Sequence, residues 1–165
     1  MQSFVFASVL ALLASSAIAA PTSCKAPATP SSEKTIYQIK DFYERKPDGK
    51  DITALGFNIA ATNGGTLDFT CVPYDPVTKA AAANFEDGHV YTCGANSLFS
   101  FSYSEKDDAN KGKLFLWQGA SPADTIQGST MIPTPYCHAG GAGPNDLACV
   151  VPAAVGEIKI EMAKP

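Results

Sequence analysis

Five cysteines are the side chains of this sequence best suited to forming covalent bonds. Cys71 and Cys93 are close in sequence, as are Cys137 and Cys149, whereas Cys24 lies alone near the N-terminus. Exported chains form disulfides, and an odd cysteine is left over. We therefore expect two intrachain disulfides, each stabilising the fold by about 3 kcal/mol on a chain-entropy estimate. Cys24 then links two copies of the chain, or it remains a single thiol capped by a small molecule.

The two histidines are the next candidates for chemistry, and neither predicts a metal site. Zinc sites use spacings such as C-x-x-C or H-x-x-x-H, which this sequence lacks. His89 shares the alternation of Tyr91 and Cys93, so we expect it to point toward the interior or its rim as a hydrogen-bonded structural residue. His138 is expected in an exposed loop. We predict no metal and no cofactor.

Candidate catalytic groups are few. The G-x-S-x-G motif of many serine hydrolases is absent, and Asp107 and Asp108 stand in a lysine-rich turn that solvent should cover. We therefore predict no catalytic residue and no enzymatic activity. The most site-like segment is CHAGGAGPNDLAC, residues 137–149, which forms either a backbone nest for an anion or a structural turn. Its candidate partner or ligand residues are His138, Gly140, Gly141 and Gly143.

The N-terminus indicates export. Residues 1–20 carry no charged side chain, residues 4–14 are apolar, and Ala17 and Ala19 form an A-x-A cleavage site. We predict a signal peptide over 1–20 rather than a transmembrane helix, and a flexible arm with the dimerising Cys24 over 21–34. A single domain is expected over 35–165. The net charge of -4 gives no electrostatic reason to bind nucleic acid or a membrane.

Alternating hydrophobicity predicts an all-β domain, built as a compact antiparallel β-barrel or sandwich. The four alanines at 80–83 are expected to form at most one short helical turn. No long amphipathic helix is indicated. The expected strands are residues 36–43, 55–61, 67–71, 89–93, 98–104, 113–118, 124–133 and 156–162.

The strands at 55–61 and 67–71 are expected to form a hairpin whose register can be predicted. A two-residue loop would place Ile59 opposite Asp68 and split the apolar faces. A three-residue loop over 63–65 places Ile59 opposite Phe69 and Phe57 opposite Cys71, so both faces agree. We therefore predict the three-residue loop.

Aromatic residues are expected mainly in the core. Phe99, Phe101 and Tyr103 alternate with serines and should point inward, and the more continuous apolar strand at 113–118 should be covered on both faces. Phe115 and Trp117 are therefore predicted to be core residues. A barrel mouth or dimer seam lined by some of these rings is the place where a flat phenolic ligand would bind.

Several segments resemble one known family. Phe42-Tyr43 and Arg45-Lys46-Pro47 lead into LGFNIAATNGGTLDFTC (55–71), followed by YTCGANS (91–97) and the glycine-rich segment 136–149. In this order they are similar to the Alternaria major allergen family, which is restricted to fungi. The resemblance implies a compact antiparallel β-barrel and a homodimer joined at Cys24. It also implies the disulfides Cys71–Cys93 and Cys137–Cys149.

The same resemblance implies a secreted protein, with spore or cell-wall association, that acts as a fungal effector, elicitor or allergen. It implies binding to a plant defence protein of the thaumatin-like class or to a flavonoid-type small molecule. The alternatives are a weak secreted hydrolase with a non-standard site and a passive wall component. Two departures bear on binding: the long loop at 72–88, and His138 at a place where a close relative would carry arginine.

Overall fold

The computed structural model of the chain describes residues 34–108 and 111–165. The predicted signal peptide and all of the predicted arm except Lys34, with Cys24, lie outside the described residues. None of the helices in the described ranges is long and apolar enough to cross a membrane.

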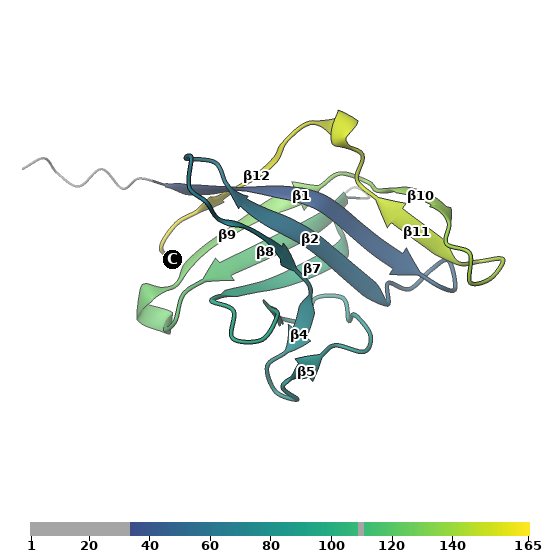
Figure 1. Cartoon of the computed structure of the whole chain (residues 1–165), viewed down its shortest axis with the longest axis horizontal. Coiled ribbons are helices and arrows are strands. Elements are labelled where there is room, and N and C mark those ends of the chain that lie inside the picture. Colours follow the sequence, from purple (N-terminus) through teal and green to yellow (C-terminus); the bar gives the residue numbers. More distant parts are fainter. Residues whose placement is uncertain (1–33, 109–110) are drawn as a thin grey trace, which may run out of the picture. The chain divides into compact units, whose positions relative to one another are not determined.

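The described residues form two antiparallel six-stranded sheets (Figure 1). The first sheet has the order β10-β11-β1-β2-β3, and β12 also pairs with β1. It contains β1 (Thr35–Lys46), β2 (Ala54–Ala61), β3 (Asp68–Cys71), β10 (Tyr136–Ala139), β11 (Leu147–Val150) and β12 (Ile158–Met162).

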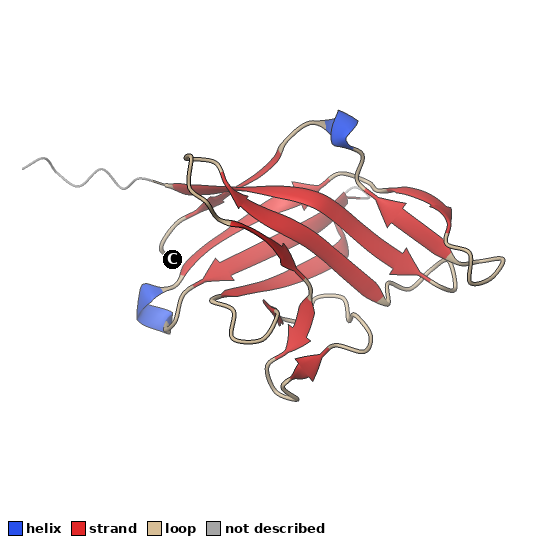
Figure 2. Ribbon diagram, viewed as in Figure 1, coloured by secondary structure: helices blue, strands red, loops and turns tan. Residues whose placement is uncertain are grey.

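The second sheet has the order β5-β4-β6-β7-β8-β9. Figure 1 shows β1 and β2 lying over β7, β8 and β9. In Figure 2 the only helical segments of the described chain are two short 3-10 turns, Pro122–Asp124 and Ala153–Val155. The strands of this sheet are β4 (Pro73–Asp75), β5 (Ala80–Ala81), β6 (Tyr91–Cys93), β7 (Phe99–Asp108), β8 (Lys111–Gln118) and β9 (Ile126–Ile132).

The all-β prediction is confirmed, and the described strands form a sandwich of two sheets rather than one closed barrel. The two sheets are joined at both sides. Gln127 and Ala163 exchange two backbone hydrogen bonds of 2.8 and 2.9 Å beside β9 and β12. On the opposite side, the Cys71–Cys93 disulfide connects β3 to β6. The alanines at 80–83 form no helical turn, and Ala80 and Ala81 pair with β4 instead.

The predicted hairpin register is confirmed. Phe57 lies opposite Cys71 and Ile59 opposite Phe69, and the Ala61 N–H donates to the Leu67 carbonyl at 2.8 Å. Gly64 occupies the left-handed region at φ 80°, which a side chain would disfavour.

A bulge in β1 decides which side chains enter the sandwich. The pairing of β1 with β2 shifts by one residue between Lys40 and Tyr43, and Asp41 adopts a φ of 51°. Side chains alternate across a strand, so one extra residue exchanges the two faces. Tyr37 and Ile39 are buried before the bulge, whereas Phe42 and Glu44 are buried after it.

The core lies between the sheets, and one prediction about it fails. Phe99, Phe101 and Tyr103 are buried as expected. Phe115 and Trp117 are not core residues: both are half-buried on the outer face of β8. Leu114 and Leu116 occupy the inner face of that strand, fully buried, so alternation sends the two aromatic rings outward.

Candidate functional site

The outer face of β8 carries a pair of aromatic rings. The rings of Phe115 and Trp117 lie 6.1 Å apart between centroids, at an interplanar angle of 16°. Trp117 Nε1 donates to Gln127 Oε1 on β9 at 3.0 Å, which fixes the indole against the sheet. The Lys113 ammonium lies 4.8 Å from the Phe115 ring centroid, a cation–π distance. This face therefore offers flat π-surfaces held by strand geometry.

An open groove of about 530 Å³, here called the Trp117 groove, runs beside the indole. Hydroxyl groups on its rim are partly fixed, because Thr125 Oγ1 donates to the Ser121 carbonyl at 2.7 Å. A flat apolar surface next to hydroxyl groups suits a planar, hydroxylated ring. The groove is lined by Val90, Ser100, Trp117, Gly119, Ala120, Ser121, Pro122, Thr125 and Pro165.

The glycine-rich segment between β10 and β11 surrounds a carboxylate of its own chain. Asp146, 2% exposed, accepts hydrogen bonds from Arg45 Nε at 2.8 Å and Arg45 Nη2 at 2.5 Å. The Ala142 N–H also donates to it, at 2.8 Å, and Arg45 Nη2 donates to the Gly140 carbonyl at 3.0 Å. The hydrogen bonds from Arg45, and then that from Ala142, lower the pKa of the Asp146 carboxyl. This arrangement is a structural turn built around an internal anion.

The other candidate residues of this segment face solvent. His138 lies on β10 rather than in a loop; it is exposed, as predicted, and its Nδ1 is 3.1 Å from the Ala139 carbonyl. Gly141 and Gly143 are exposed. A Cβ on Gly140 would come within 2.4 Å of Asp146 Oδ2, so only glycine fits at this position without a shift of the carboxylate. Strand β10 is an outer strand of its sheet, and Tyr136 on it is 66% exposed.

His89 does not point into the interior, which leaves the rim as the one of the two predicted positions that fits. Strand β6 begins only at Tyr91, and Gly88 turns the chain with a φ of 75°. The exposed His89 ring lies edge-on to Tyr91, 4.6 Å between centroids. Within the described residues, no group of His, Cys, Asp and Glu side chains is placed to hold a metal ion.

Both intrachain disulfides are present in the structure. Cys71 pairs with Cys93 across a Cα distance of 4.4 Å, and Cys137 pairs with Cys149 across 4.0 Å. The first bridge is buried between the sheets, and the second staples the β10–β11 hairpin. They are the pairings that the family resemblance implies.

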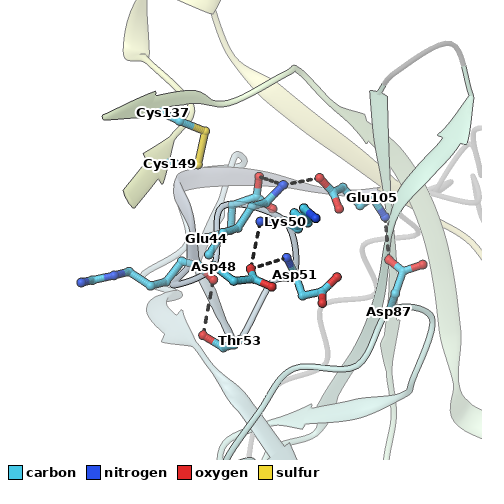
Figure 3. Close-up of polar contacts among 11 residues, drawn as sticks. Glu44, Asp48, Lys50, Asp51, Thr53, Asp87, Glu105, Cys137 and Cys149 are labelled. Carbon is cyan, nitrogen blue, oxygen red and sulfur yellow. Dashed lines mark hydrogen bonds and ion pairs between the residues drawn. A yellow bond between two sulfur atoms is a disulfide. The ribbon is translucent and has the colours of Figure 1, made fainter. Parts of the chain in front are cut away.

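Sequence reasoning missed a buried charged cluster at one end of the sandwich (Figure 3). Glu44 on β1 and Glu105 on β7 approach from the two sheets, and the Lys46 ammonium pairs with Glu105 and lies 4.0 Å from Glu44. Burial, offset in part by Lys46, raises the pKa of Glu44 to about 7. Burial also raises the pKa of Tyr103, which faces the cluster. Glu44 enters the interior only because of the β1 bulge, and no sequence motif predicts that bulge.

Comparisons with known proteins agree with this fold. The family model of Alternaria alternata allergen 1 matches residues 39–149. Allergen Ulo b 1 of Alternaria botrytis is 45% identical over 69% of this chain and 74% of its own length. Major allergen Alt a 1 of Alternaria alternata is 44% identical over 69% of this chain and 65% of its own length, just under two thirds.

Solved structures give the same result. A crystal structure of Alternaria alternata allergen Alt a 1 superposes with a TM-score of 0.63 at 38% identity, covering 83% of this chain and 95% of that one. A second crystal structure of Alt a 1 gives a TM-score of 0.62 at 36% identity, over 82% and 98% of the two chains. From the matched segment and the shared sandwich, this chain belongs to the Alternaria alternata allergen 1 family.

Proposed function

We propose that this chain is an exported fungal effector of the allergen type that acts by binding and not by catalysis. Family membership supports the proposal, because the similar proteins are named as allergens. The described chemistry supports it too. His89 contacts a tyrosine ring and His138 its neighbour's carbonyl, so neither ring is paired with a candidate nucleophile.

The Trp117 groove is the proposed ligand site, and its ligand is a flat phenolic molecule of the flavonoid type. The observation that carries this proposal is the half-buried indole beside a groove of about 530 Å³. A phenolic ring stacks on the indole, and its hydroxyl groups exchange hydrogen bonds with the Ser100, Ser121 and Thr125 hydroxyls.

Fluorescence titration tests this site directly, because Trp117 is the one tryptophan of the whole sequence. We expect a flavonol to quench the indole with saturation at roughly 10–50 µM, in the range of a modest small-ligand affinity. Ser121→Lys, in the groove lining, should weaken binding about tenfold. Ser129→Lys adds the same charge to an exposed position outside the lining and should leave it unchanged. A flat titration of the wild-type protein would refute the ligand site.

A plant defence protein of the thaumatin-like class is the second candidate partner. The exposed outer strand β10, with Tyr136 66% exposed, favours it, because the edge of a sheet can pair with another chain. Pull-down from plant apoplastic fluid should retain such a protein, and Tyr136→Ser should reduce its recovery. Val155→Ser, at a position 49% exposed, serves as the matched control. Recovery of nothing specific would instead favour a passive wall component.

A covalent homodimer through Cys24 completes the proposal. Cys24 lies outside the described residues, and both disulfides seen in the structure use the other four cysteines. Non-reducing gels should show a dimer for the wild-type protein and a monomer for Cys24→Ser. A covalent dimer of the variant would show that another cysteine makes the link.

A further inference from the structure

The end of the sandwich near Glu44 contains a second cavity, separate from the Trp117 groove. It measures about 170 Å³ and lies between β1 and β7, next to Thr134 and Pro135, which lead into β10. We call it the Glu44 cavity. It is lined by Glu44, Lys46, Tyr103, Glu105, Lys106, Gly112, Thr134, Pro135 and Cys137.

One oxygen atom in this cavity is incompletely satisfied. Glu44 is 2% exposed, and its Oε2 has no hydrogen-bond partner among the residues that the structure describes. A buried carboxylate oxygen without a partner is costly, because water no longer solvates it. Lys46 does not fill this role: its ammonium pairs closely with Glu105 and stays 4.0 Å from Glu44 Oε1.

The nearest cation to Glu44 is shared. Lys46 on β1 lies between Glu44 and Glu105 of β7 and pairs closely with Glu105. Lys106 is the other cation of the lining, and Tyr103 is neutral. Outside the lining, Asp87 accepts the Glu105 N–H at 2.7 Å. Two carboxylates and two ammonium groups therefore line the cavity, and among the described residues Glu44 Oε2 lacks a donor.

We infer that the Glu44 cavity binds a small ammonium-type cation, whose N–H donates to Glu44 Oε2. The charge and the missing donor select the cationic head. The Tyr103 ring and Pro135 offer apolar surface to a short alkyl tail. The volume is close to that of a cavity known to hold one benzene-sized molecule, so a primary amine of about three carbons fits.

Propylammonium is the probe, and 1-propanol is its neutral counterpart of matched size. At pH 8 we expect propylammonium to raise the Tm of the wild-type protein with half-saturation at roughly 1 mM, as expected for a ligand of four heavy atoms. Equal concentrations of 1-propanol should not raise it. An equal rise with both compounds, or with neither, would overturn the inference.

Two variants locate the effect. Glu44→Gln removes the charge at the same size and should abolish the rise. Glu157→Gln, at an exposed ion pair with Lys159, is the matched control and should retain it. A full response in Glu44→Gln would assign binding elsewhere and refute the site.

A measurement on the wild-type protein alone keeps the inference testable if Glu44→Gln fails to fold. A proton and an ammonium cation compete for the same carboxylate, so affinity should fall about tenfold or more from pH 8 to pH 5.5. Lys46, Tyr103, Glu105, Lys106 and Asp87 also face the cavity or its carboxylates. Affinity independent of pH would contradict the inference.

Discussion

Two buried carboxylates, Asp146 and Glu44, have opposite environments. Arg45 and Glu44 are neighbours on β1, but they point to opposite faces. Arg45 leaves the sandwich and binds Asp146 through two N–H groups, and a backbone N–H completes that cluster. Glu44 enters the sandwich and shares Lys46 with Glu105. Both carboxylates are 2% exposed, but Glu44 lies between the two sheets, whereas Asp146 lies in the turn between β10 and β11.

The comparison shows that hydrogen-bond donors and depth of burial together set the pKa of a carboxyl group. Asp146 has its donors and its pKa is lowered, so it is charged at neutral pH and holds the β10–β11 turn. Glu44 lacks a donor at Oε2 and its pKa is raised to about 7. Its charge therefore responds to pH and to any cation that enters the cavity. The first group stabilises the β10–β11 turn, and the second is the carboxylate of the proposed cation site.

Inserting one alanine directly after Asp41 should have the largest effect. The bulge supplies the one extra residue that keeps Phe42 and Glu44 facing inward. A second extra residue would shift the alternation again, so Tyr43 and Arg45 would enter the core and Phe42 would face solvent. We expect no cooperative thermal unfolding and no dispersed amide NMR spectrum for the insertion variant.

Asp41→Gly is the control, because it keeps the residue count. Glycine tolerates the φ of 51°, although the hydrogen bond from Asn58 to the Asp41 carboxylate is lost. The variant should fold with stability within about 1 kcal/mol of the wild type. A well-folded insertion variant would show that the residue count at the bulge does not set the faces.

Glu44→Gln should remove a pH dependence of stability. The pKa of Glu44 rises from 4.5 to about 7 on folding, so the folded state binds its proton more tightly. This stabilisation is fully present below pH 4.5 and is lost as the pH rises through 7. The wild type should lose up to about 3 kcal/mol between pH 4.5 and 8, measured by urea unfolding. Parallel pH profiles for wild type and Glu44→Gln would contradict this account.

Asp146→Asn should give the smallest of these effects and the opposite pH profile. It removes the charge that holds Arg45, so we expect the Tm at pH 7 to fall by roughly 5 °C. The pKa of Asp146 is lowered in the folded state, so its contribution is present above pH 3.8 and lost as the pH falls below that. The difference between wild type and variant should therefore vanish in strong acid. A difference that persists there would point to packing instead of charge.

Local sequence patterns predicted the regular parts of the fold because each pattern carries its own period. The hairpin of β2 and β3 is the best case, since one register brings Phe57, Ile59 and Phe69 onto matching faces. The same logic failed for Trp117. An apolar run does not reveal whether another layer covers its second face, and none of the described strands covers the outer face of β8 at that residue. His89 does not reach the interior because the strand begins two residues later than its alternation suggested.

Period-two alternation and cysteine spacing act over short distances, so they were enough to predict an all-β chain, the hairpin register and which residues could form local disulfides. The faces that Glu44 and Arg45 occupy, and the groups that each one meets there, depend on tertiary packing. A single extra residue at Asp41 reverses those faces. Glu105 on β7 lies 61 residues after Glu44 in the sequence. Asp146, which Arg45 binds, lies 101 residues after Arg45. Such long-range juxtapositions depend on how two sheets pack, which no local pattern encodes.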